Sequence, residues 1–160
     1  MFSAGSETSA TAVDWAITEM IKTPRVMKTA QNEVREVFNR KGQIDETCIR
    51  EMKYLNLVIR ETLRLHPPIP LLLPRECGEK CEIDGNEIPV KSKVPQTNFE
   101  YIPFGAGRRI CPGISYGLAN VELPLAFLLY HFDWKLPNGM KHEDLDMPSA
   151  LLSEENKICT

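Results

Sequence analysis

The chain has 160 residues, of which 42% are hydrophobic and 26% charged, which is ordinary for a soluble globular domain. The formal net charge is −3 and lysines and arginines form no block, so neither nucleic acid nor an anionic membrane surface is an expected partner. Five irregularly spaced cysteines argue against a disulfide framework and favour a reducing compartment. No apolar run is long enough to cross a bilayer, and the first residues lack a signal-peptide pattern.

Apolar residues at helical spacing predict the first elements of the chain. A helix is expected over residues 10–22. Thr23 then has the character of an N-cap, with Pro24 in the first turn of a second helix that closes near Gly42. Asp45 is expected to cap a short helix that follows.

The middle of the chain predicts one more helix and a small amount of strand. The helix runs over residues 53–65 and stops at His66, because a residue before proline avoids helical geometry. Two short β-prone stretches flank Asp84, Gly85 and Asn86, a pattern typical of a β-hairpin.

The last third predicts a loop followed by a long helix. Residues 91–97 have the character of a linker, and glycines and prolines punctuate residues 98–113. An apolar helix is expected over residues 114–132, kinked at Pro124, and residues 137–160 are polar and weakly patterned. The predicted fold class is mainly α with a small β component.

The loop before this last helix carries the most informative residues. Cys111 lies just before a helix start, where the positive end of the helix dipole favours thiolate over thiol. Gly105 and Gly107 allow positive φ and a close approach of the backbone to a flat ligand. Arg109 is placed to reach an anionic group at the edge of that ligand, and Phe104 offers a ring to pack beneath it.

This loop resembles the haem-binding loop of the cytochrome P450 family, F-x-x-G-x-R-x-C-x-G. Its fixed positions are all matched, by Phe104, Gly107, Arg109, Cys111 and Gly113. The resemblance implies haem b as cofactor, with Cys111 as the axial thiolate ligand of the iron and the other four residues around the cofactor. The alternative is an ordinary buried cysteine in a glycine-rich loop. The implied fold is an incomplete, C-terminal portion of the cytochrome P450 fold.

Glu61 and Arg64 lie one helical turn apart and are similar to the family's E-x-x-R motif. The resemblance implies a buried structural pair that braces the haem-binding core, whereas the alternative is a common surface ion pair. Arg75 follows in an extended stretch, and by resemblance it contacts a haem propionate. Its alternative is a solvated arginine. Leu71 and Leu72 are then expected to line the substrate side of the haem.

Near the N-terminus, residues 4–9 read A-G-S-E-T-S, similar to the family's oxygen-binding helix motif. The resemblance implies that Glu7 and Thr8 are catalytic and relay protons to dioxygen, while Gly5 leaves room beside the haem. Taken by itself, the segment is better explained as a capped helix start, and only the motifs downstream favour the catalytic interpretation.

The resemblance covers residues 1–147, as a partial cytochrome P450 domain, and leaves residues 148–160 as a divergent tail. Between Val94 and Pro95 the family's segment with a P-E-R-F motif is absent, and its arginine normally contacts the E-x-x-R pair. The anchor and the helices that roof the pocket would precede Met1. We therefore expect a truncated chain that binds haem weakly by itself.

The implied function is that of a plant microsomal haem-thiolate monooxygenase. It inserts one oxygen atom of O₂ into an apolar small molecule, with electrons from an NADPH-dependent flavoprotein reductase. For full-length members, the family implies a location in the endoplasmic reticulum membrane. For this chain, which lacks an anchor, the expected location is the cytosol. A second hypothesis is a truncated, non-catalytic product that acts as an interaction module or has no function. A third, with weak support, is a zinc site that uses Cys77 and Cys81 with Cys111 or His131.

Overall fold

The computed structural model of the protein describes residues 2–42, 46–70, 72–73, 76–92, 103–136 and 145. In these ranges the chain is mostly helical, with one two-stranded sheet, and this confirms the predicted fold class. The helices and strands are α1 (Phe2–Lys22), α2 (Pro24–Lys41), α3 (Glu46–Ile49), α4 (Lys53–Leu65), β1 (Cys81–Ile83), β2 (Asn86–Ile88) and α5 (Ile114–His131).

Helix α1 is longer than predicted, because it takes in the motif at residues 4–9. The hydroxyl groups of Thr8 and Ser9 donate hydrogen bonds to the carbonyl oxygens of Ala4 and Gly5, at 2.6 and 2.9 Å. Side chains of this kind at a helix start usually cap the backbone, but here they bond back one turn and leave the helix uninterrupted. The expectation of a helix beginning at residue 10 was therefore wrong.

The ends of α2 follow the sequence closely. Pro24 occupies the first turn, and Gly42 closes the helix in the left-handed conformation with φ of 75°. Thr23 holds the N-cap position as expected, although its side chain makes no capping hydrogen bond. Asp45, the predicted cap of α3, lies outside the described residues.

The later elements also match their predictions. Helix α4 has the expected bounds, and His66 follows it as the C-cap. In the hairpin, Cys81 pairs with Ile88, and the turn residues Asp84 and Gly85 both have positive φ, 49° and 77°. Positive φ at both central residues is the geometry of a type I′ turn. Helix α5 continues through Pro124, and the kink expected there stays a prediction.

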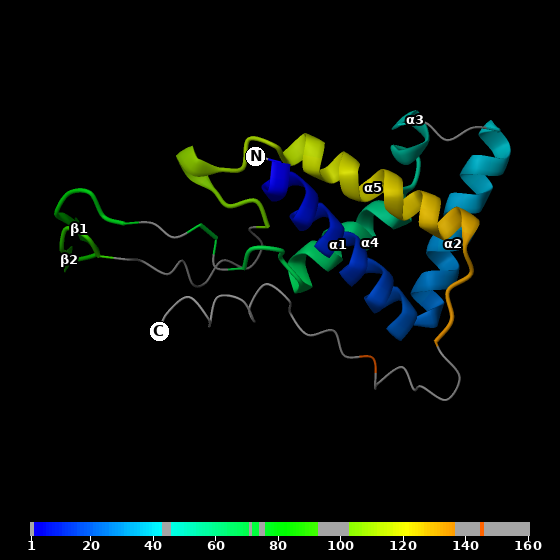
Figure 1. The fold of residues 1–160 in the computed structure, drawn as a ribbon, viewed down its shortest axis with the longest axis horizontal. Coiled ribbons are helices and arrows are strands. Elements are labelled where there is room, and N and C mark those ends of the chain that lie inside the picture. The colour runs from blue at the N-terminus through cyan, green and yellow to red at the C-terminus, as the bar shows by residue number, and fades with distance from the viewer. Residues whose placement is uncertain are drawn as a thin grey trace.

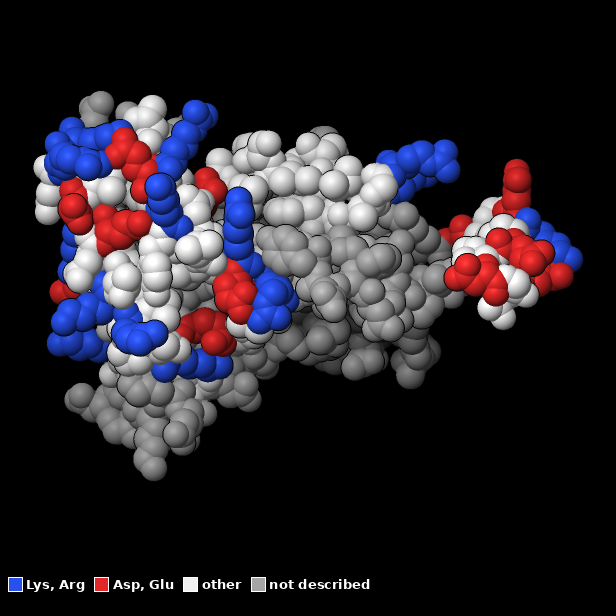
Figure 2. Space-filling model, turned by 180° about the vertical axis from the view of Figure 1, so that it is seen from behind, with Lys and Arg blue, Asp and Glu red and all other residues white. Residues whose placement is uncertain are grey.

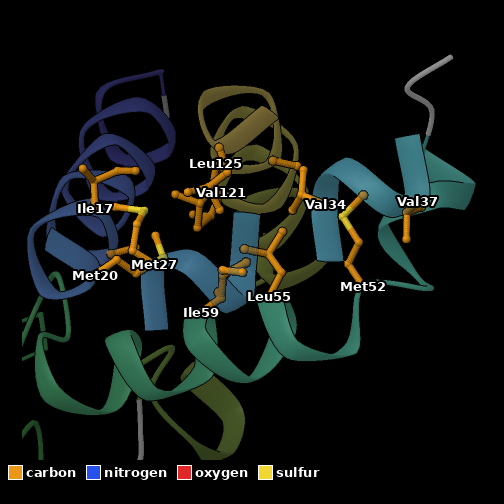
Figure 3. Packing of buried hydrophobic residues seen from close by; sticks show 14 of the residues in the cluster. Ile17, Met20, Met27, Val34, Val37, Met52, Leu55, Ile59, Val121 and Leu125 are labelled. Atoms are coloured by element: carbon orange, nitrogen blue, oxygen red, sulfur yellow. The ribbon is translucent and has the colours of Figure 1, made fainter. Parts of the chain in front are cut away.

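Helices α1, α2, α4 and α5 enclose one hydrophobic core. Figure 3 shows side chains from all four helices converging on it, with Val121 and Leu125 of α5 reaching towards Ile17 of α1 and Leu55 of α4. Leu125 is completely buried, as is Val34 of α2. Burial of such residues is the main favourable contribution to the stability of the domain.

Polar side chains connect helices that are distant in sequence. The two carboxylate oxygens of Glu33 on α2 accept hydrogen bonds from the backbone N–H groups of Tyr54 and Leu55, both at 2.9 Å. They satisfy two free donors in the first turn of α4, where a negative charge is also favoured by the helix dipole. Gln31 donates to the carbonyl oxygen of Phe132 at 2.9 Å and so holds the end of α5 against α2.

The molecule is elongated, and its two ends differ. In Figure 1 the hairpin projects away from the helices at one end, and the start of α1 lies beside the start of α5. Figure 2 shows charged side chains of both signs gathered at the α2 and α3 end and again on the hairpin. None of the described helices combines the length and apolar character needed to span a membrane.

Candidate functional site

The cysteine loop is closed by its own backbone. The N–H of Cys111 donates to the carbonyl oxygen of Phe104 at 2.9 Å, and the N–H of Ile110 donates to that of Gly107 at 3.2 Å. Inside the loop that the first of these hydrogen bonds closes, residues Gly107–Arg109 form one turn of 3₁₀ helix. Gly105 and Gly107 adopt positive φ of 72° and 68°, a region that side chains other than glycine rarely enter. The glycines predicted from the motif are thus required by the loop itself.

The Cys111 thiol lies at the N-terminal end of α5. It is a free, half-buried cysteine, two residues before the N-cap residue Gly113. A Cβ atom at Gly113 would lie 3.9 Å from the Cys111 sulfur, so glycine keeps that flank of the sulfur clear. The Cys111 residue thus remains half-buried rather than enclosed in the core.

Phe104 connects the loop to the core. Its half-buried ring packs against the hydrophobic core, and a Cβ at Gly117 would lie 3.6 Å from Phe104 Cε1. Gly117 therefore allows the ring to lie on the first turn of α5. The motif alone did not identify Gly117, although its position four residues after Gly113 on the same helix face was a usable signal.

The segment after α4 also reaches the cysteine loop. A Cβ atom built on Gly105 would lie 3.8 Å from the methyl groups of Leu72. The Leu72 side chain therefore lies against the cysteine loop. Arg109 is exposed, so its guanidinium can reach an anionic partner. Leu71 and Arg75, the predicted propionate ligand, lie outside the described residues.

Glu61 and Arg64 form the predicted pair. Arg64 donates two hydrogen bonds to the Glu61 carboxylate, at 2.8 and 2.6 Å. The hydrogen bond from Arg64 lowers the pKa of Glu61, and the same bond raises the pKa of Arg64.

The predicted burial of this pair was wrong. The Glu61 and Arg64 side chains are 57% and 49% exposed, because they project from the face of α4 opposite to Ile59 and Leu63, which enter the core. An exposed pair of this kind contributes little to stability.

The start of α1 reaches the same end of the molecule as the cysteine loop (Figure 1). A Cβ at Gly5 would lie 3.8 Å from Cε1 of Tyr116, which belongs to the first turn of α5. Glu7 is exposed and Thr8 is half-buried, with the Thr8 hydroxyl donating to the Ala4 carbonyl oxygen. The fold thus brings the start of α1, where Gly5 lies, against the first turn of α5, which follows the cysteine loop. The roles expected for Glu7 and Thr8 stay predictions.

The described residues fit the proximal side of a haem. A haem iron needs only one ligand from this side of the protein, and Cys111 offers an accessible thiol next to a glycine and two residues from an exposed arginine. In the part of the chain that the structure describes, no three His, Cys, Asp or Glu side chains gather to hold a metal ion. The zinc site proposed from Cys77 and Cys81 with Cys111 or His131 therefore does not form there.

His66 has partners that the sequence did not indicate. Its ring stacks on Trp15 of α1, with centroids 3.8 Å apart and an interplanar angle of 4°. Its Nε2 lies 3.2 Å from a carboxylate oxygen of Glu19. The interpretation of His66 as a helix-end residue is confirmed, but it is not isolated, since it connects the end of α4 to α1.

Comparison with known proteins gives consistent matches. A sequence profile described as cytochrome P450 matches residues 1–97 and 91–160. The chain is 56% identical to desmethyl-deoxy-podophyllotoxin synthase of Sinopodophyllum hexandrum, over 92% of this chain and 35% of that protein. It is 49% identical to salviol synthase of Salvia pomifera and 50% identical to tabersonine 16-hydroxylase 2 of Catharanthus roseus, each over 99% of this chain and 38% of the relative. The chain therefore spans somewhat more than a third of the length of these relatives.

Two details of the matches bear on the predicted domain. The match to salviol synthase extends over 190 residues, although this chain has 160, so the relative carries internal residues that are absent here. The profile matches in two segments that overlap at residues 91–97, the region where the P-E-R-F segment was expected. The second segment extends to residue 160, and the division predicted at residue 147 stays a prediction. The cysteine loop, the E-x-x-R pair and these matches together show that the chain belongs to the cytochrome P450 family.

Proposed function

We propose that this chain carries part of the haem site of a haem-thiolate monooxygenase that inserts one oxygen atom of O₂ into an apolar small molecule. The observation that carries the proposal is the closed loop that presents the half-buried Cys111 thiol at the start of α5. The names of the relatives, which include synthases and hydroxylases of plant metabolites, support a substrate from plant secondary metabolism. An NADPH-dependent flavoprotein reductase is the proposed electron donor, and the endoplasmic reticulum membrane the proposed location of a full-length protein.

Cys111 is the proposed residue that would hold a haem, through its thiolate. Bound haem would supply the redox chemistry that cleaves the O–O bond, which a thiolate ligand favours. Phe104 would pack beneath the ring, and Gly107 and Gly113 would keep the loop close to it. The exposed Arg109 would pair with a propionate, and we propose the same role for Arg75.

On the distal side, Thr8 and Glu7 would move protons. The Thr8 hydroxyl now donates to the Ala4 carbonyl oxygen, so its hydrogen must rotate about the Cβ–Oγ1 bond before it donates elsewhere. The Glu7 carboxyl is exposed and can exchange protons with water. Together they would pass protons from solvent to the reacting oxygen.

A second candidate is a non-catalytic product that acts as an interaction module or has no function. The internal residues that salviol synthase has and this chain lacks favour it, as does the exposure of the Glu61–Arg64 pair. A haem site with less protein around it loses the dry surroundings that tune iron and protect intermediates.

The absorption spectrum separates the two candidates. The purified chain is supplied with haem, reduced and exposed to carbon monoxide, beside Cys111→Ser and the matched control Cys81→Ser. We expect a red-shifted, thiolate-type Soret band in the wild type and in Cys81→Ser that is lost in Cys111→Ser. A folded chain without that band, with helical circular dichroism retained, would reject the monooxygenase proposal and favour the second candidate.

A further inference from the structure

Two cysteines outside the cysteine loop lie side by side at the base of the hairpin. The sulfur atoms of Cys77 and Cys81 are 3.7 Å apart, and both thiols are free. In a regular strand, residues four apart are separated by about 13 Å. The chain between them must therefore leave the strand path at residues 78–80. This excursion brings the two sulfurs together.

The backbone on each side of the excursion is held by β2 and the segment that follows it. The N–H of Cys77 donates to the carbonyl oxygen of Ser92 at 3.0 Å, and its carbonyl oxygen accepts from the N–H of Lys91 at 2.8 Å. Cys81 pairs with Ile88 in the sheet. Since both cysteines are anchored to one neighbouring segment, their proximity is part of the hairpin's structure.

We propose that Cys77 and Cys81 form a reversible dithiol–disulfide site that a small-molecule disulfide oxidises. Closure needs the sulfurs to approach from 3.7 Å to a bond length of about 2.05 Å. Cys81 is exposed, so rotation of its side chain meets little resistance. The proposal uses none of the residues assigned to the haem site and does not depend on that function.

The chemistry is thiol–disulfide exchange. One cysteine thiolate attacks the small disulfide, whose S–S bond breaks and releases one thiolate with the electron pair. The second cysteine, after losing its proton to solvent, attacks the mixed disulfide and releases the other thiolate. The two cysteines are thereby oxidised by two electrons, and the small disulfide is reduced to two thiols.

The surroundings predict how the reaction responds to conditions. The hydrogen bond with Cys77 raises the pKa of the Cys81 thiol, so the rate of closure should rise as pH increases above neutral. Glu79, Glu82 and Glu87 are exposed on the same hairpin, where Figure 2 shows acidic side chains beside basic ones. Lys80 pairs with Glu87 at 2.8 Å, but acidic residues still outnumber the basic Lys80 and Lys91 between residues 76 and 92. A cationic disulfide such as cystamine should therefore react faster than the anionic oxidised glutathione. Added salt should reduce this difference in reaction rate, because it screens the charges.

Peptide mapping tests the site directly. The full chain is treated with cystamine, blocked with an alkylating reagent and digested with trypsin without reduction. Cleavage after Lys80 places Cys77 in the peptide of residues 76–80 and Cys81 in that of residues 81–91. We expect mass spectrometry to find these two peptides joined by a disulfide, and the joined species to disappear when the digest is reduced.

Single variants complete the test. In Cys77→Ser and Cys81→Ser the remaining sulfur has no partner, so we expect a stable mixed disulfide with the reagent in place of the joined peptides. Cys48→Ser, which removes a cysteine buried in the core, should leave the joined peptides unchanged. The proposal is overturned if wild-type Cys77 and Cys81 each carry the reagent without becoming joined.

Discussion

The helical core and the end that carries the cysteine loop are built in different ways. In the core, four helices contribute fully buried side chains such as Leu125 and Leu55, and polar groups such as Glu33 satisfy distant helix ends. The cysteine loop depends on two backbone hydrogen bonds and two glycines in the left-handed region. Its cysteine is half-buried and its arginine is exposed.

The difference shows where stability and chemistry reside in this chain. Apolar burial fixes the helices, and it places the ends of α1 and α5 beside each other. In the cysteine loop at this end, the side chains that the family resemblance marks for chemistry are half-buried, as Cys111 and Phe104 are, or exposed, as Arg109 is. Substitutions in the two regions should therefore differ in size and kind.

The largest effect is expected in the core. Leu125→Ala removes a completely buried side chain between helices, so the free energy of unfolding should fall by about 2 to 5 kcal/mol. Leu57, which is 61% exposed on α4, is the matched control, and Leu57→Ala should change it by less than about 0.5 kcal/mol. Urea unfolding followed by circular dichroism measures both. Equal losses would mean that the helices do not share the core described above.

A smaller effect is expected at the carboxylate that caps α4. Glu33→Ala leaves the N–H groups of Tyr54 and Leu55 without acceptors and should cost about 1 to 3 kcal/mol. Glu36, which is exposed on the same helix, gives the control Glu36→Ala. The same unfolding measurement applies. If Glu33→Ala and Glu36→Ala lower the free energy of unfolding equally, Glu33 does not act as the cap of α4.

In the cysteine loop the expected cost comes from backbone conformation alone. Gly107 has φ of 68° and open space around a Cβ, so Gly107→Ala should lower stability by about 1 kcal/mol through the left-handed conformation. Gly78→Ala, where space is also open and φ is ordinary, should be nearly neutral. Thermal unfolding compares them. If Gly78→Ala is as costly as Gly107→Ala, the left-handed conformation is not the cause.

The smallest effect is expected at the exposed Glu61–Arg64 pair, and it should depend on pH. Because Arg64 lowers the pKa of Glu61, the pair stabilises the fold above the ordinary carboxyl pKa and loses that contribution as pH falls through the lowered value. Glu61→Gln should therefore lower stability slightly at neutral pH and converge with the wild type in acid. Unfolding measured across pH 2 to 7 tests the sign. A large loss would indicate a buried role instead.

Much of the local structure was predictable. Local signals marked the ends of α2 and α4, through Pro24, Gly42 and the prolines after His66, and the hairpin turn at Asp84 and Gly85. The start of α1 was not predictable, because hydroxyl side chains are found both at helix caps and inside helices. Packing against α5 decides between the two.

The cysteine motif, the E-x-x-R pair and the membership of the cytochrome P450 family were determined by the sequence by itself, because they depend on residue types at fixed spacing. Only the tertiary structure decided that Glu61 and Arg64 face solvent, that Trp15 stacks on His66, and that Cys77 lies against Cys81. These relations depend on which helix face the core buries and on where the chain departs from a regular strand. Packing between helices that are distant in sequence sets the first, and backbone hydrogen bonds from Cys77 to Lys91 and Ser92 hold the second.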